Sequence, residues 1–178
     1  GEMVREAVTV VTKAGYLQGQ NFALSQERRQ RGRPFPELVP YGEGLEHCIH
    51  PEFLEDQITR SLTRLGLATI DVLLLHNPEY YLGWAARQGT ATAEARRVYM
   101  DRIRRACDHL EREVARGRIR WYGVSSNTFP AAAERADFTS LTHVVACAQE
   151  ARDDHHLAVV QFPMNLFESG AVCEGNQP

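Results

Sequence analysis

The stretch that decides the fold is Ile70-Asp71-Val72-Leu73-Leu74-Leu75-His76, in which apolar side chains follow one another with one interruption. A strand with one face in water alternates apolar and polar residues, whereas a parallel strand covered on both faces has a nearly continuous apolar run. This stretch has the second pattern. Three further runs of the same kind occur, at residues 8–11, 119–124 and 158–162. Together they predict a parallel sheet.

Segments with helical periodicity separate these runs. Pro51 favours the first turn of a helix, and apolar residues then recur every three or four positions, at Leu54, Ile58, Leu62 and Leu65. This spacing gives a helix one apolar face, so we expect a helix from residue 51 to 66. Similar stripes predict helices over residues 92–116 and 140–152. The alternation of strands and helices predicts βαβ units and an α/β fold.

Composition excludes several classes of protein. The chain has 178 residues, 43% hydrophobic and 24% charged, which is typical of one soluble domain. Its formal net charge of -3 provides no field that would attract nucleic acid or anionic lipid. The four cysteines are far apart, without a C-x-x-C pair, as is typical of reduced cytoplasmic thiols. We therefore expect a single cytoplasmic domain over residues 1–178, with no nucleic-acid or membrane partner.

Residues 15–50 do not fit an ordinary connection between a strand and a helix. The segment is rich in Pro and Gly and carries a basic run at residues 28–33. Loops longer than about 15 residues are usually functional or mobile. We expect a long loop excursion over one face of the sheet, with the basic run more often solvated than bound to phosphate.

Polar side chains lie at or just after the end of each apolar run. They are Lys13, His76, the turn Ser125-Ser126-Asn127, and Gln161. Because the carboxyl ends of parallel strands meet at one edge of a sheet, we expect these groups to lie together. Lys13 is also the single lysine among 20 basic side chains. A site that needs a compact ammonium, which Arg cannot supply, would explain its retention.

Four segments of the chain resemble the aldo-keto reductase family. The most specific is residues 61–76, which is similar to a helix end, the fourth strand and the catalytic His of that family. Residues 10–15 resemble its third strand with the catalytic Lys, and residues 160–166 its sixth strand with a Gln that contacts nicotinamide. Residues 117–127 resemble its fifth strand, but Ser126 holds the position of the family's Asn and Asn127 follows. Either of these two residues could make that cofactor contact.

The resemblance implies a partial (β/α)₈ TIM barrel. A complete barrel of this kind needs about 250 residues, so this chain would hold strands three to six, about half of the barrel. We expect it to be a fragment of a longer product. The family's catalytic Asp and Tyr would then precede Gly1, and much of the adenosine-phosphate site would follow Pro178.

The resemblance also implies NADPH-dependent reduction of an aldehyde or ketone, with NADH as the alternative cofactor. Lys13 would lower the pKa of the catalytic Tyr, because a neighbouring cation stabilises phenolate. His76 would orient the carbonyl oxygen by a hydrogen bond. Ser125 and Gln161, with Ser126 or Asn127, would bind the nicotinamide carboxamide.

Two other interpretations remain open from the sequence. Lys13 could form a Schiff base in an aldolase on a similar barrel, or the barrel could be a cofactor-binding or regulatory subunit without turnover. We expect a small-molecule carbonyl substrate as the partner, although the sequence determines neither its identity nor the oligomeric state.

Two residue clusters are less specific. The cluster His47-Cys48-Ile49-His50 has no second pair at a suitable spacing, so we expect no metal there. Tyr80, Tyr81 and Trp84 follow His76 in an expected loop, where they could line a pocket or only pack. Tyr16 is not assigned as the missing acid, because the family's acid comes from another strand.

Overall fold

The centre of the molecule is a four-stranded parallel sheet. A computed structural model describes residues 4–177. The strands are β1 (Val11–Ala14), β5 (Ile70–His76), β6 (Ile119–Ser125) and β7 (Leu157–Gln161), arranged side by side in the order β1-β5-β6-β7. The predicted parallel sheet is confirmed, although β1 begins where the first predicted run ends.

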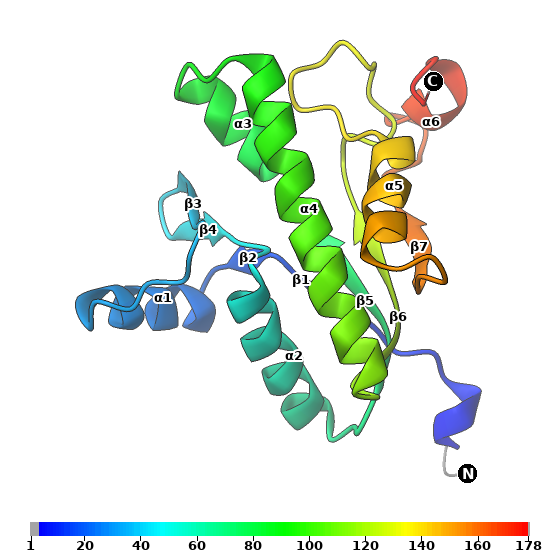
Figure 1. The fold of residues 1–178 in the computed structure, drawn as a ribbon. Coiled ribbons are helices and arrows are strands. Elements are labelled where there is room, and N and C mark those ends of the chain that lie inside the picture. Colours follow the sequence, from blue (N-terminus) through cyan, green and yellow to red (C-terminus); the bar gives the residue numbers. More distant parts are fainter. Residues whose placement is uncertain (1–3, 178) are drawn as a thin grey trace.

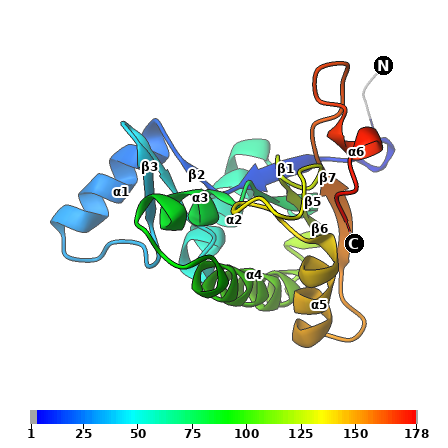
Figure 2. The same cartoon turned by 90° about the horizontal axis from the view of Figure 1, so that it is seen from above.

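Three long helices pack against this sheet (Figure 1). They are α2 (Pro51–Leu65), α4 (Thr92–Ala115) and α5 (Leu141–Ala151), and all three were predicted within a residue or two. Figure 2 shows α4 and α5 along the same side of the strands. The main core lies between the helices and the sheet, where Leu73, Leu75 and Tyr122 meet Ile103 and Leu110. Among residues 4–177, no helix combines the length and apolar character needed to cross a bilayer.

The opposite face of the sheet is less covered than the apolar runs predict. All of β5 up to Leu75 is buried, but Val11 and Trp121, which both pair with Val72, are 50% and 47% exposed. The prediction of two covered faces is therefore right for β5, whereas β1 and β6 each expose an apolar side chain on this face. In a (β/α) barrel this face lines the interior. The architecture is that of a partial TIM barrel.

The helix ends follow local sequence rules. His50 begins α2, because its Nδ1 accepts a hydrogen bond from the Glu52 amide at 3.2 Å and Pro51 needs no partner at the first position. Gly66 ends this helix with a φ of 64°, a left-handed conformation that glycine adopts without strain. Ser140 caps α5, with its Oγ accepting from the His143 amide at 3.3 Å.

The segment 15–50 is a folded unit rather than the long loop that the sequence predicts. It contains β2 (Tyr16–Leu17), α1 (Gln20–Gln30), β3 (Val39–Gly42) and β4 (Leu45–His47). The three strands form an antiparallel sheet in the order β2-β4-β3. Strands this short show no alternation, and α1 buries only Ser25, so neither leaves a hydrophobic pattern in the sequence.

The segment after His76, which was expected to be a loop, is a short helix. Tyr80, Tyr81 and Trp84 belong to α3 (Tyr80–Arg87), in which Tyr81 is buried in the main core. A 3₁₀ helix (Arg5–Ala7) precedes β1, and α6 (Gly170–Cys173) lies near the end of the described chain. The basic run begins in the last turn of α1, where Arg28 pairs with Glu52 and Arg29 with Glu46.

Candidate active site

The register of the sheet brings the predicted polar residues onto one face. His76 pairs with Ser125, and Ser125 pairs with Gln161, so these three residues share one row across β5, β6 and β7. Lys13 pairs with Leu74. Leu74 and His76 are two residues apart and therefore point to the same side of the strand. All four side chains thus lie on the face opposite the helices, at the carboxyl ends of the strands.

Hydrogen bonds connect three of these residues directly. The Lys13 Nζ donates to the Ser125 Oγ at 3.4 Å, and the Ser125 hydroxyl donates to the Gln161 Oε1 at 3.0 Å. Since the Gln161 oxygen is directed at Ser125, its amide nitrogen points away from Ser125 and can donate its two N–H groups to another acceptor. The ammonium, hydroxyl and amide form one continuous polar chain.

These residues line an open hollow of ≈ 320 Å³. Its lining consists of Lys13, His76, Asn77, Ser125, Asn127, Gln161, Phe162 and Pro163. The hollow is open because Lys13, Asn127 and Gln161 are exposed, whereas Ser125 is buried at its base. Phe162 and Pro163 give it an apolar wall that the sequence did not identify.

His76 is held in its neutral form at physiological pH. Partial burial and the neighbouring Lys13 ammonium both lower the pKa of its imidazole. A neutral imidazole that faces the hollow can donate one hydrogen bond from a ring nitrogen and remain uncharged. This property suits a group that orients an oxygen without first giving up a proton.

The turn after β6 places its two polar side chains on opposite sides. Ser126 is 1% exposed, and its hydroxyl lies in a buried network with the hydroxyls of Thr128 and Thr139, each at 3.2 Å. Asn127 instead lines the hollow, and its backbone amide donates to the Glu79 Oε1 at 2.8 Å. Of the two residues that the sequence left as alternatives, Asn127 is the one beside the hollow.

Glu79 is a supporting residue that sequence reasoning missed. Its side chain is buried at 4% exposure, and burial raises the pKa of its carboxyl to about 7. Through the Asn127 amide it joins the segment that follows β5 to the turn that follows β6. In the sequence, the one indication that Glu79 could support the site is its position three residues after His76.

Tyr16 contacts two residues that line the hollow, His76 and Asn77. Its hydroxyl accepts a hydrogen bond from the Asn77 Nδ2 at 2.6 Å, and burial raises the pKa of its phenol. A raised pKa opposes the ionised form that a reductase acid passes through. No tyrosine is among the described residues that line the hollow.

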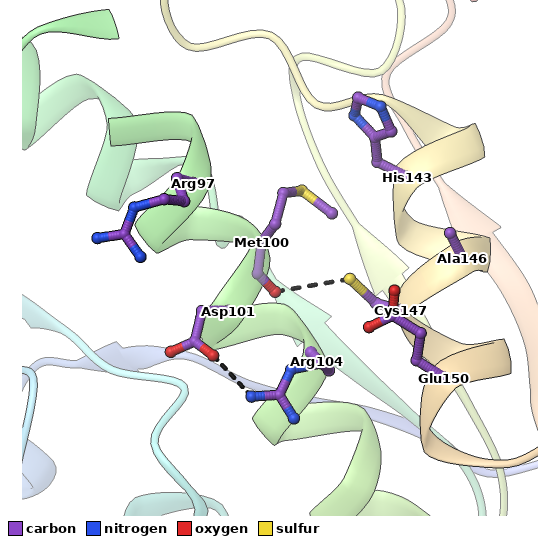
Figure 3. A pocket seen from close by; sticks show the side chains of 8 residues that line it. All are labelled: Arg97, Met100, Asp101, Arg104, His143, Ala146, Cys147 and Glu150. Atoms are coloured by element: carbon purple, nitrogen blue, oxygen red, sulfur yellow. Dashed lines mark hydrogen bonds and ion pairs between the residues drawn. The ribbon is translucent and has the colours of Figure 1, made fainter. Parts of the chain in front are cut away.

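A second groove lies on the helical side of the molecule, between α4 and α5 (Figure 3). It has a volume of ≈ 420 Å³, and its lining includes Met100, Asp101, Arg104, His143 and Cys147. Asp101 and Arg104 pair with each other at 2.7 Å, and the Cys147 thiol donates to the Met100 carbonyl at 3.5 Å. These groups are already partnered, and the sheet separates them from Lys13 and His76.

Residues of metal-ligating type also gather between α2 and α4. Ligand atoms of Glu55, His109 and Glu113 lie within 4.8 Å of one another. Arg116 and Arg118 pair with both carboxylates, at 2.6–3.1 Å, and neutralise their charge. The arrangement is an ion-pair network. In the cluster at residues 47–50, the side chains diverge: His50 caps α2, and the Cys48 thiol donates to the Pro36 carbonyl at 3.3 Å.

Comparison with known proteins identifies relatives of this chain. The family model described as "Aldo/keto reductase family" matches residues 2–172. The aldo-keto reductase AKR11C1 from Bacillus halodurans (holo form) shares 21% identity over 71% of this chain and 29% of its own, with a TM-score of 0.43. The glycerol dehydrogenase AKR11B4 from Gluconobacter oxydans shares 22% identity over 74% and 30%, with a TM-score of 0.45. The matched part thus spans less than a third of either structure, and no curated protein matches.

Proposed function

Because the chain belongs to the aldo/keto reductase family, we propose that its hollow serves NADPH-dependent reduction of an aldehyde or ketone to an alcohol. The observation that carries this proposal is the convergence of an ammonium, a neutral imidazole and two amide side chains on one open hollow. They come from β1, β5, β7 and the turn after β6, and Ser125 of β6 lies among them. NADH is the alternative cofactor, since none of these groups distinguishes the two nucleotides.

The donor set of the hollow fits a nicotinamide carboxamide, which is planar and carries one acceptor and two donor positions. The bond from Ser125 to the Gln161 oxygen orients the side-chain amide, so that its nitrogen would donate to the carboxamide oxygen. The Asn127 side chain offers a second amide at the rim. When bound, the reduced nicotinamide supplies the hydride.

His76 and Lys13 would act on the substrate oxygen. Negative charge develops on the carbonyl oxygen as the hydride arrives, and a hydrogen bond from the His76 imidazole stabilises and orients it. The Lys13 ammonium favours the ionised form of a neighbouring acid and so lowers the pKa of that acid. The proton itself must come from a group other than the described lining residues, which include no tyrosine.

One observation favours a second candidate, a barrel that binds the cofactor without turnover. That observation is the same lack of a tyrosine among the described lining residues. The two candidates share the nicotinamide contacts and differ only in chemistry. A cytoplasmic location is part of the proposal and is supported by three buried free thiols, at Cys48, Cys107 and Cys147.

The nicotinamide contacts can be tested on this chain by NMR. We expect reduced nicotinamide mononucleotide and NADPH, each titrated into ¹⁵N-labelled protein, to shift the Ser125 and Asn127 amides and the Gln161 side-chain amide. Gln161→Leu should abolish these shifts, and Ser126→Ala, on the buried side of the turn, should preserve them. Shifts confined to the groove between α4 and α5, or no shifts at millimolar ligand, would reject the proposal.

The chemical step needs a second experiment. We expect the 178-residue chain alone to consume no NADPH with an aldehyde. In a polypeptide that joins it to the remaining barrel strands, His76→Ala and Lys13→Met should each lower kcat by about 10²–10⁴-fold. Near-normal rates in both variants would exclude the assigned roles. Trapping of Lys13 by borohydride with substrate would favour the aldolase instead.

A further inference from the structure

Strand β1 leaves the parallel sheet just before the row that contains His76. Its last pair with β5 is Ala14 with Leu75, and Tyr16 already pairs with His47 of β4. Between them, the Gly15 carbonyl accepts from the Cys48 amide at 2.8 Å, so it too belongs to the small sheet. A Cβ atom at position 15 would lie 2.4 Å from the His76 carbonyl oxygen, which is closer than real Cβ contacts.

Where β1 no longer pairs with β5, the imidazole of His47 hydrogen-bonds to the end of β5 instead. Its Nε2 lies 2.7 Å from the His76 carbonyl oxygen. A carbonyl can only accept, so this nitrogen carries the proton and donates it. His47 is 1% exposed, and burial lowers the pKa of its ring to about 4, which keeps the ring neutral. The backbone of His76 is thus held by a side chain from the small sheet.

The side chain of His76 is held from the same direction. The Tyr16 ring meets the His76 ring edge-on, with the centroids 4.4 Å apart. The Tyr16 hydroxyl accepts from the Asn77 Nδ2 at 2.6 Å, and Asn77 adopts a φ of 48°, which is uncommon for a residue other than glycine. Tyr80 of α3 packs on Tyr16, with centroids 5.1 Å apart, and stacks on Tyr41 of β3 at 3.9 Å.

From these contacts we propose that the β2-β4-β3 sheet is a positioning device for His76, and that His47 and Tyr16 are its positioning residues. The inference rests on the proposed role of His76 as the group that orients the carbonyl oxygen. His47 fixes the backbone at the end of β5, and Tyr16 fixes the ring and the residue that follows. Neither residue lines the hollow, so both act through His76.

The direct test measures the order of the His76 ring, not activity. In protein with ¹³C-labelled histidine, with His76 assigned from His76→Gln, ¹³C relaxation reports motion of this ring. We expect His47→Leu, which removes the donor, to mobilise the ring or split its signal. His47→Gln places an amide N–H near the position of the imidazole Nε2–H and should restore one ordered signal. Tyr16→Phe keeps the ring contact and should change mainly the Asn77 side-chain amide.

The matched control is His109→Leu, which removes another buried histidine, on α4, away from the hollow. It should leave the His76 ring ordered at temperatures where all variants are folded. An ordered ring in His47→Leu would overturn the proposal. So would equal mobility in His47→Leu, His47→Gln and His109→Leu, because that pattern reports general loss of stability. If His47→Leu does not fold, Tyr16→Leu takes its place: it removes the ring contact with His76 and should mobilise the His76 ring, and an ordered ring in that variant would overturn the proposal.

Kinetics in a polypeptide with the remaining barrel strands separate this proposal from the proposed function. A small misplacement of a catalytic group can cost on the order of 10²-fold in rate, so His47→Leu should lower kcat by about that factor while the KM for NADPH stays unchanged. His47→Gln should recover most of the rate. If no variant, including wild type, reduces a carbonyl, the proposed function fails, whereas the ring measurements still report on the positioning device.

Discussion

The two sheets of this protein meet at Gly15 and serve the same site in different ways. The parallel sheet has strands of up to seven residues and one large core, and its strands carry Lys13, His76 and Gln161. The antiparallel sheet has strands of two to four residues and a separate small core of Leu17, Phe35, Cys48 and Phe53. The first sheet supplies the groups that would react, and the second supplies contacts that hold one of them. A site can therefore depend on a structure that contributes nothing to its lining.

The stabilities of the two regions can be compared by creating a cavity in each core, one at a time. Leu75 and Leu17 are both 0% exposed, but Leu75 belongs to the large core and Leu17 to the small one. Substitution of a buried leucine by alanine costs about 2–5 kcal/mol, and less where the site can collapse. We expect Leu75→Ala near the upper end and Leu17→Ala near the lower end, measured by urea unfolding.

A second probe shows whether the regions unfold together. In a Trp84→Phe background, the fluorescence of Trp121 on β6 follows the parallel sheet, while circular dichroism follows the whole chain. Coincident transitions in both leucine variants would show one cooperative unit. An early circular dichroism transition limited to Leu17→Ala would show that the small sheet unfolds on its own, and would weaken its role as a support for His76.

Mild acid should destabilise the folded protein through two buried histidines, His47 in the small sheet and His109 on α4. Burial lowers the pKa of His47 and of His109 to about 4, whereas the unfolded chain titrates near its ordinary value of 6.5. As the pH falls from 7 to 5, these two histidines bind protons in the unfolded state but remain largely neutral in the folded state. Each histidine should therefore cost about 2 kcal/mol of stability, and this loss is measured in a Glu79→Gln background, because the Glu79 carboxyl with its pKa of about 7 gains a similar amount over the same interval.

Urea titrations at pH 7 and pH 5 measure this loss. His47→Gln and His109→Gln should each flatten the dependence by about half, since glutamine does not titrate in this range. Above pH 5 the carboxylates with lowered pKa values remain ionised and contribute little change. Equal stability of Glu79→Gln at both pH values would show that these rings titrate in the folded protein as they do in the unfolded chain.

The parallel sheet could be predicted from sequence because each part leaves a local pattern. The apolar run of β5 and the stripes of α2, α4 and α5 recur with fixed periods, and the carboxyl ends of parallel strands must share an edge. This rule is enough to predict that Lys13 and His76 lie at the same edge of the sheet, even though the sequence gives no distance between them. The depth of the core behind β5 follows too, because an uninterrupted apolar strand needs cover on both faces.

The small sheet and the supports of the site could not be predicted in this way. A strand of two residues has no period, and α1 has too few buried residues to form a stripe. The role of His47 depends on contact with a residue 29 positions away, which no local pattern encodes. The backbone of the turn decides which of the adjacent residues Ser126 and Asn127 points its side chain into the hollow. The sequence does not show this direction, so both residues remained candidates.

Glu79 offers a smaller test on the parallel-sheet side of the comparison. Burial raises the pKa of this carboxyl to about 7, above the unfolded value of 4.5, so the folded state holds a proton that the unfolded state releases. The contribution of Glu79 to stability should therefore fall by about 2 kcal/mol between pH 5 and pH 8, against the opposite contribution of His47 and His109. Glu79→Gln keeps an oxygen for the Asn127 amide and removes this contribution, so in urea unfolding the variant should gain about 2 kcal/mol more than wild type between the two pH values.

The smallest effect concerns the neighbours Ser125 and Ser126, which face opposite sides of one turn. Ser126→Ala removes the hydroxyl that accepts from the buried Thr128 amide at 3.1 Å, which should cost about 1 kcal/mol of stability, although the hydroxyls of Thr128 and Thr139 still bond to each other. Ser125→Ala removes the donor to the exposed Gln161 side chain, whose oxygen can turn to water, so stability should change less. An NMR titration with nicotinamide mononucleotide should show the opposite order. Ser125→Ala should weaken binding more than Ser126→Ala does. Equal binding losses in both variants would mean that the turn acts as a unit and that the direction of each hydroxyl is immaterial.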